Sequence, residues 1–138
     1  MEKQGIPDFI VVDDDPTSNK ICKWNIKKAF PDAGIQTFTD PQAGLEYILS
    51  TYSSPEANYG ILFLDINMPN MTGWEFMDHF ENFNPNVKER IKVFIVSSSV
   101  DQRDMQRAKI NKNILDYIVK PISKENIQTK IVQEKIFV

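Results

Sequence analysis

The chain has 138 residues and a net charge of −3, and 25% of its residues are charged. This length fits one domain of ordinary size, and the mildly acidic charge gives no electrostatic basis for binding nucleic acid or an anionic membrane. No apolar run approaches the ~20 residues of a membrane span, and residues 1–5 lack the apolar core of a signal peptide. The single cysteine, Cys22, cannot form an internal disulfide, so we expect a cytoplasmic protein in which Cys22 packs as a small hydrophobic residue.

Short apolar runs alternate with amphipathic segments along the chain, which is the pattern of repeated strand–helix units. The expected strands are residues 9–12, 35–38, 60–64, 93–96 and 117–119. The expected helices begin near Asp15 or Pro16, at Asp40 and Pro41, after the turn-rich loop 68–73, at Asp101 and at Ser123. Residues 84–86, Asn-Pro-Asn, are expected to break the third helix.

This (βα)5 pattern predicts an α/β fold, a doubly wound, flavodoxin-like five-stranded parallel sheet with helices on both faces. We take the strand order 2-1-3-4-5 from flavodoxin-like proteins rather than from the spacing. That order places the alternating run 35–38 at an edge and the apolar runs 9–12 and 60–64 at the centre. We predict a single domain over 1–138, with its core at about 7–136 and no output domain.

Polar residues follow four of the expected strands at the point where each strand ends. They are Asp13, Asp14 and Asp15 after the first strand, Asp65 after the third, Ser97 after the fourth and Lys120 after the fifth. Because the carboxyl ends of parallel strands meet at one edge of a sheet, we expect these side chains to converge there.

Neighbouring carboxylates repel one another, and a divalent cation removes the conflict. Mg2+ prefers oxygen ligands, so Asp14 and Asp65 are expected to bind it directly, Asp13 through a water, and Asn67 through its backbone carbonyl. A carboxylate can attack phosphorus to give an aspartyl phosphate, and Asp65 is the expected nucleophile. Mg2+ and the Lys120 ammonium would then supply positive charge, and the Ser97 hydroxyl would donate a hydrogen bond to a phosphoryl oxygen.

With these residues the chain resembles the response-regulator receiver domains of two-component systems. The matching segments are residues 11–15 (Val-Val-Asp-Asp-Asp), 64–69 (Leu-Asp-Ile-Asn-Met-Pro) with 72–73 (Thr-Gly), 96–99 (Val-Ser-Ser-Ser) and 117–121 (Tyr-Ile-Val-Lys-Pro). They span nearly the whole chain in the family's order and spacing.

The resemblance implies Asp65 as phosphoacceptor, Asp13 and Asp14 as the acidic pair, and Ser97 and Lys120 as the switch hydroxyl and lysine. It also implies a cis peptide between Lys120 and Pro121. A one-residue slip in the acidic pair stays open among three consecutive aspartates; otherwise Asp15 is expected to cap the following helix.

The resemblance further implies a conformational switch, in which Ser97 moves toward the phosphoryl group and Tyr117 turns inward. A plain half-buried strand tyrosine is an equally weighted interpretation of Tyr117. The signalling face would run from about residue 101 to 135, over the fourth helix, the fifth strand and the fifth helix.

The implied protein is a phosphoacceptor signalling domain rather than an enzyme, although it would promote its own phosphorylation and dephosphorylation. His79, the only histidine, is expected at a polar position of the third helix. The donor would therefore be a sensor histidine kinase, a histidine phosphotransfer protein or a small phosphoryl compound. The output would pass by contact to a downstream protein that the sequence does not identify, or the domain would relay the phosphoryl group onward.

Two other interpretations fit parts of the sequence. Residues 13–17 match the Asp-x-Asp-x-Thr signature of haloacid-dehalogenase-like phosphatases, with Asp13 as nucleophile and Asp15 as general acid. That interpretation gives Asp65 no role and lacks the acidic pair that should follow Lys120, where only Glu125 and Glu134 occur. A receiver that signals without taking phosphate is the other interpretation.

Overall fold

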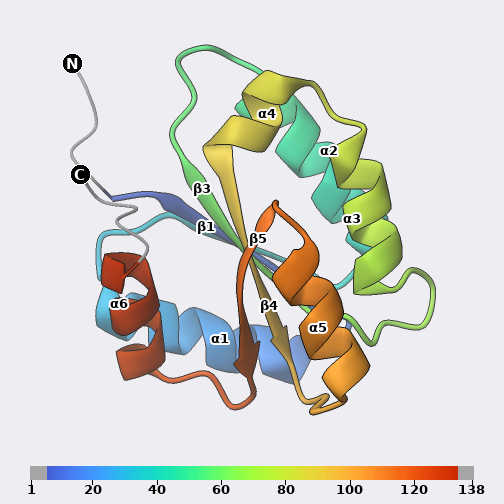
Figure 1. Cartoon of the computed structure of the whole chain (residues 1–138). Helices are drawn as coiled ribbons and strands as arrows, with labels where there is room; N and C mark the ends of the chain where they lie inside the picture. The colour runs from blue at the N-terminus through green and yellow to red at the C-terminus, as the bar shows by residue number, and fades with distance from the viewer. Residues whose placement is uncertain (1–5, 134–138) are drawn as a thin grey trace.

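The computed structural model describes residues 6–133 of the chain. Its strands form one parallel sheet in the order β2-β1-β3-β4-β5, which confirms the predicted order (Figure 1). The strands are β1 Asp8–Val12, β2 Ile35–Phe38, β3 Gly60–Leu64, β4 Ile91–Ser97 and β5 Ile114–Val119. Both β4 and β5 start earlier than predicted, because Lys92 and Asp116 interrupt the apolar runs in the sequence but still pair in the ladder.

Residues 6–133 contain six helices, one more than predicted. They are α1 Pro16–Ala29, α2 Pro41–Tyr52, α3 Gly73–Glu81, α4 Pro85–Arg90, α5 Gln102–Ile110 and α6 Lys124–Gln133. The additional helix is α4, and the triplet that was expected only to break a helix also starts one. The Asn84 side chain accepts a hydrogen bond from the Val87 amide at 3.1 Å, and Pro85 occupies the first helical position.

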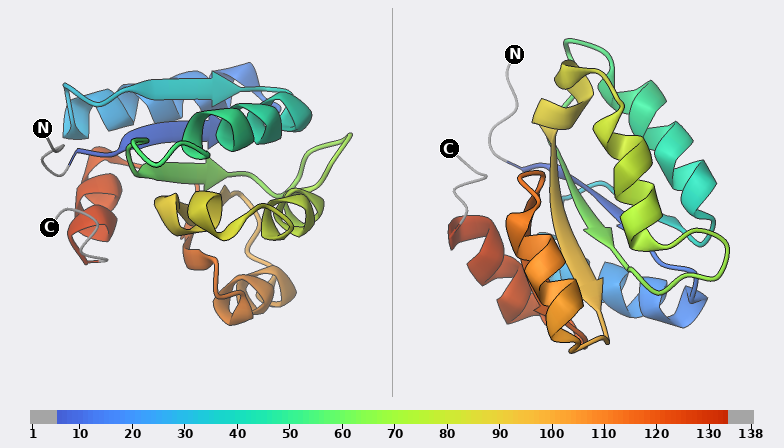
Figure 2. Two further views of the ribbon diagram at one scale, coloured as in Figure 1. Left: turned by 90° about the horizontal axis from the view of Figure 1, so that it is seen from above. Right: turned by 45° about the vertical axis from the view of Figure 1, so that its right-hand side comes forward.

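The side chains of the central strands alternate between two apolar layers, one on each face of the sheet. Phe9 and Val11 of β1 pack with α1 and α6, whereas Ile10 and Val12 pack with α2, α3, α4 and α5. Figure 1 and the two views of Figure 2 show α1 and α6 on one side of the sheet and the other four helices on the opposite side. The strands are therefore covered on both faces, as predicted for continuous apolar runs.

Strand β2 is the edge strand, as predicted, but its burial does not alternate strictly. Ile35 and Phe38 are both partly buried, and they pack against opposite layers of the core. Gln36 and Thr37 between them are exposed. Each face of this edge strand thus contributes one apolar side chain to the core.

The predicted core at about 7–136 stays a prediction, because its residues 134–136 lie outside the described residues. The same holds for Glu134 and for the end of the expected signalling face at residue 135. Among the helices described, none has both the length and the apolar character needed to cross a membrane.

Candidate functional site

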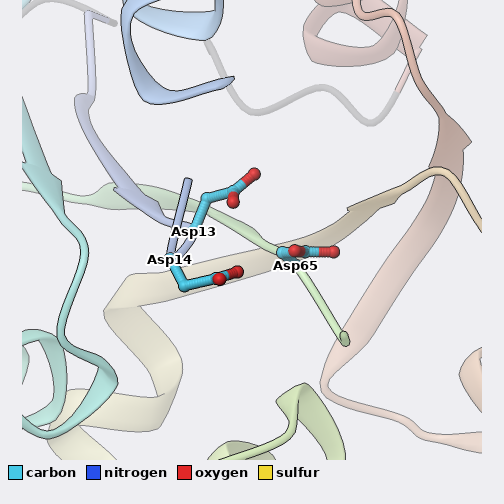
Figure 3. Close-up of side chains that lie close together, drawn as sticks. All are labelled: Asp13, Asp14 and Asp65. Atoms are coloured by element: carbon cyan, nitrogen blue, oxygen red, sulfur yellow. The ribbon is translucent and has the colours of Figure 1, made fainter. Parts of the chain in front are cut away.

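Three carboxylates meet at the carboxyl edge of the two central strands. One carboxylate oxygen from each of Asp13, Asp14 and Asp65 lies within 4.8 Å of the other two, and Figure 3 shows the three side chains close together. The Asp65 amide donates a 3.0 Å hydrogen bond to the Val12 carbonyl, which extends the β1–β3 pairing to the site itself. Asp13 and Asp65 are 4% and 7% exposed and Asp14 is half-buried, so the acidic cluster is largely shielded from water.

The Lys120 ammonium reaches the same cluster from the end of β5. Its Nζ lies 2.6 Å from Asp13 Oδ2 and 3.9 Å from Asp65 Oδ2, and it also donates to the Ser18 hydroxyl at 3.4 Å. The Lys120 amide donates to the Ser97 carbonyl at 2.9 Å, so the β4–β5 ladder continues up to the lysine. The peptide between Lys120 and Pro121 is cis, as the resemblance implied.

Burial and neighbouring charge act on the ionisation of this cluster. Burial, together with the Asp13 charge, raises the pKa of Asp65 above its ordinary value, although the Lys120 charge opposes the shift. For Lys120, burial lowers the pKa, but the hydrogen bond to Asp13 and the charges of Asp65 and Asp13 outweigh it and raise the pKa overall. The lysine is therefore charged at neutral pH, whereas burial disfavours the charged form of Asp65.

Ser97 ends β4 and is fully buried beside this edge. Its hydroxyl accepts a 3.1 Å hydrogen bond from the Ser99 amide. Tyr117 is half-buried, and its hydroxyl donates to the Ser99 carbonyl at 2.8 Å. Asn67 lies in the loop after β3 with an exposed side chain, and its amide is 3.4 Å from Asp65 Oδ1.

Asp15 does not belong to the cluster. Its carboxylate is exposed and caps α1, accepting from the Thr17 amide at 2.9 Å and from the Ser18 hydroxyl at 3.4 Å. The helix-cap interpretation of Asp15 is confirmed. The carboxylates that lie together with Asp65 are those of Asp13 and Asp14.

The sequence reasoning missed Asn19, which fixes the turn that carries Asp13. Asn19 is 4% exposed, and its Nδ2 donates to the Asp13 carbonyl at 2.9 Å and to the Phe38 carbonyl at 3.4 Å. The signal was available in the sequence, because Asn19 stands at helical spacing from Cys22 and Ile26 on the buried face of α1. A polar residue on an apolar stripe needs a hydrogen-bonding partner.

A cavity of about 300 Å3 opens beside Asp65 and Lys120, between α1 and the segment after β5. Cys22 lines it and is 5% exposed, which confirms the expectation of a packed cysteine. Burial, together with the Asp13 charge, raises the pKa of the Cys22 thiol to about 12. The thiol is therefore protonated and unreactive at neutral pH.

Gly73 brings the start of α3 against the Asp65 loop more closely than any other residue type would allow. A Cβ at this position would lie 2.6 Å from the Asp65 carbonyl oxygen and 2.7 Å from Ile66 Cα. The Gly73 amide also donates to the Ile66 carbonyl at 3.0 Å. The Thr72 and Glu75 side chains hold the helix start through a reciprocal capping box.

Residues 9–132 match the family model described as response regulator receiver domain. The chain therefore belongs to the response regulator receiver family and is a signalling domain of the two-component type. The phosphatase interpretation is not favoured, because the family match covers nearly the whole chain and the structure uses Asp15 as a helix cap.

Two curated relatives match most of this chain. The sensor histidine kinase CheAY of Helicobacter pylori is 29% identical over 133 residues, and the two-component response regulator ARR11 of Arabidopsis thaliana is 28% identical over 134 residues. These alignments cover 94% and 93% of this chain. They cover 15% and 23% of the relatives, so the chain spans less than a quarter of their length.

Solved structures agree with the match. The two-component response regulator from Cytophaga hutchinsonii has a TM-score of 0.84 at 26% identity, over 96% of this chain and 98% of that one. The response regulator receiver protein from Dyadobacter fermentans DSM 18053 has a TM-score of 0.82 at 26% identity, over 91% and 95% of the two chains.

Replacing Gly73 by alanine should destabilise the protein by about 1–3 kcal/mol, because the new methyl group overlaps backbone atoms that cannot turn away. Urea unfolding measures the change. Gly34→Ala is the matched control, since a Cβ there would meet only the Asp8 side chain at 3.4 Å, and its effect should stay within about 0.5 kcal/mol. Equal effects of the two substitutions would contradict the close approach of Gly73.

Replacing Asp65 by asparagine should stabilise the protein at pH 7 in EDTA, by about 1 kcal/mol, because it removes a charge that burial penalises. In the wild type, this penalty is present above the folded-state pKa of Asp65. It disappears as the pH falls through that pKa and the carboxyl group takes up a proton. The advantage of the variant in urea unfolding should therefore shrink in acid. A variant less stable than wild type at pH 7 in EDTA would refute this account.

Proposed function

We propose that Asp65 accepts a phosphoryl group from a phosphohistidine of another protein, in a reaction that requires Mg2+. The observation that carries the proposal is the arrangement of charge around Asp65. Its buried carboxylate faces two further carboxylates within 4.8 Å, and the Lys120 ammonium lies 3.9 Å away. The carboxylates can bind a cation, and the Lys120 ammonium together with that cation can balance the charge of a phosphoryl group.

The acidic cluster suits Mg2+. Asp13, Asp14 and Asp65 offer hard oxygen donors within 4.8 Å of one another, and one or two carboxylates with further oxygen donors is the usual magnesium set. We assign Asp14 and Asp65 as direct ligands, Asp13 as a ligand through water, and the Asn67 backbone carbonyl as a further donor. When bound, the ion supplies positive charge against the phosphoryl oxygens.

In the proposed step, an Asp65 carboxylate oxygen attacks phosphorus and forms a P–O bond, while the P–N bond breaks and the donor imidazole nitrogen keeps the electron pair. Lys120 is already charged and positioned, so it can follow the phosphoryl oxygens without a proton transfer. The Ser97 hydroxyl donates to a phosphoryl oxygen once it turns from its bond with the Ser99 amide.

The donor histidine is proposed to come from a sensor histidine kinase or a histidine phosphotransfer protein in the cytoplasm. His79, the only histidine of the sequence, is exposed on α3, as expected. That one relative is a sensor histidine kinase supports a kinase as partner. The downstream target is proposed to be a protein rather than nucleic acid or membrane, in keeping with the net charge of −3.

Phosphorylation is proposed to act on a switch made of Ser97 and Tyr117. The two residues are already joined through Ser99, whose amide bonds Ser97 Oγ and whose carbonyl accepts from the Tyr117 hydroxyl. A movement of Ser97 toward Asp65 therefore disturbs Ser99, whose carbonyl accepts the hydrogen bond from Tyr117. The signalling surface would comprise α5, β5 and α6, which flank Tyr117 in the fold.

The protein is also proposed to promote its own dephosphorylation. A water attacking the phosphorus would contact residues two positions beyond Asp65 and Ser97, which are Asn67 and Ser99. The exposed Asn67 side chain leaves this approach open to solvent. The Ser99 hydroxyl is held by a 2.9 Å hydrogen bond to Asp104.

Acetyl phosphate with Mg2+ should label Asp65, and EDTA should prevent the labelling. Peptide mapping by mass spectrometry locates the phosphoryl group. Asp65→Asn should remain unlabelled. Asp15→Ala should still be labelled, although loss of the cap lowers its stability by about 1 kcal/mol.

Label on Asp13, or loss of labelling in Asp15→Ala, would favour the phosphatase interpretation instead. A receiver that signals without phosphate would show itself differently, as an Asp65→Asn protein that behaves like wild type in its pathway.

Beryllofluoride, which mimics a phosphoryl group on aspartate, should shift the amide resonances of Ser97, Ser99 and Tyr117 when Mg2+ is present. The reason is the shared hydrogen bonding of these three residues. Asp65→Asn serves as the control and should show no shift. Binding of beryllofluoride without any change at Ser97 and Tyr117 would end the switch proposal.

A further inference from the structure

We infer that Asp104 positions the Ser97 hydroxyl by tying the turn 97–99 to Trp74 of α3, an inference that rests on the proposed function of Asp65 and Ser97. Asp104 touches neither the acidic cluster nor Lys120 in the interactions described above. It is a positioning residue in this proposal, and it acts through Ser99.

The two oxygens of the Asp104 carboxylate bind two different elements. Oδ1 accepts from the Trp74 indole Nε1 at 3.1 Å, and Oδ2 accepts from the Ser99 hydroxyl at 2.9 Å. Both hydrogen bonds are partly buried and involve a charged acceptor, so they are stronger than bonds between neutral groups in water. We call this pair of hydrogen bonds the Asp104 bridge.

One end of the bridge is fixed to the loop that carries Asp65. Trp74 directly follows Gly73, whose backbone packs against the Asp65 carbonyl and donates to the Ile66 carbonyl. The Trp74 side chain therefore starts from the part of α3 that lies closest to the phosphoacceptor.

The other end of the bridge is fixed to the switch. The Ser99 amide donates to Ser97 Oγ at 3.1 Å, and the Ser99 carbonyl accepts from the Tyr117 hydroxyl at 2.8 Å. The Ser99 hydroxyl also accepts from the Asp101 amide at 3.2 Å, just before α5 begins. A single side chain at position 104 thus holds the turn to which both Ser97 and Tyr117 are bonded.

Helix α5 has little apolar packing to fix its position without these contacts. Ala108 is its one buried residue, Asp104 and Met105 are half-buried, and its other residues, Ile110 among them, are exposed. Arg107, one turn after Asp104 on the same helix face, places its guanidinium 4.8 Å from the centre of the Trp74 ring. Helix α5 therefore contacts Trp74 in two ways. Asp104 accepts the hydrogen bond from the indole N–H, and the Arg107 guanidinium lies over the ring.

Without the bridge, the turn 97–99 is free to move relative to the Asp65 loop. The Ser97 hydroxyl then has to be ordered when it meets a phosphoryl oxygen, and this ordering weakens binding of any phosphoryl group or mimic. Mg2+ binding should not change, because Asp13, Asp14 and Asp65 lie outside the bridge.

The test compares Asp104→Ala, Asp104→Asn, Trp74→Phe and the double variant Asp104→Ala/Trp74→Phe with wild type. Gln106→Ala, an exposed change on the same helix, is the control. Calorimetry measures the affinity for Mg2+ alone and then for beryllofluoride in saturating Mg2+. Urea unfolding checks that each protein is folded. Trp74→Phe, which removes the indole N–H and keeps a smaller aromatic ring under Arg107, carries the test if Asp104→Ala does not fold.

Asp104→Ala should weaken beryllofluoride binding roughly tenfold, as expected for loss of hydrogen bonds to a charged group, with Mg2+ affinity within about twofold of wild type. Trp74→Phe should act in the same direction, and the double variant should be no weaker than Asp104→Ala, because both changes break one bridge. Asp104→Asn should recover most of the affinity, since its amide oxygen can accept from the Trp74 indole N–H while its NH2 group donates to the Ser99 hydroxyl oxygen.

Unchanged beryllofluoride affinity in Asp104→Ala would overturn the inference. The inference would also be overturned if the losses of beryllofluoride affinity in the two single variants multiplied in the double variant. It would be overturned as well if Mg2+ affinity fell as much as beryllofluoride affinity. The proposed function is tested separately by Mg2+-dependent beryllofluoride binding to wild type that Asp65→Asn abolishes. A wild type that does not bind would overturn both proposals.

Discussion

The ion pair between Lys120 and the buried carboxylates is the interaction on which the site depends. Asp13 and Asp65 are nearly inaccessible to water and carry like charges, so each raises the free energy of the other. The Lys120 ammonium, 2.6 Å from Asp13, offsets that repulsion from a third strand. The three groups directly follow β1, β3 and β5, and only a completed parallel sheet brings them together.

The fold supplies this meeting point through ordinary backbone pairing. Hydrogen bonds from the Asp65 amide to the Val12 carbonyl, and from the Lys120 amide to the Ser97 carbonyl, carry the ladders one residue past the apolar runs. Asn19 then pins the chain where it leaves β1. Main-chain hydrogen bonds thus fix the positions from which the charged side chains extend. The side chains do not have to move apart to relieve their repulsion.

The residues of the acidic cluster and Lys120 could be predicted because they depend only on strand ends, and strand ends follow from the apolar runs. Helix α4 could not, because Asn84 and Pro85 are both a stop signal and a start signal, and the sequence does not say which applies. The Asp104 bridge was also out of reach. It joins Trp74 to Ser99 across two helices whose relative position is fixed only by tertiary packing.

Cys22 has a consequence for experiments on the protein. It is the single thiol of the sequence, it is 5% exposed, and burial raises its pKa to about 12. Maleimide and other alkylating reagents act on the accessible thiolate, so the native protein should give almost no background. One cysteine introduced on the surface of α5 can therefore carry a spin label or fluorophore without first removing the natural residue.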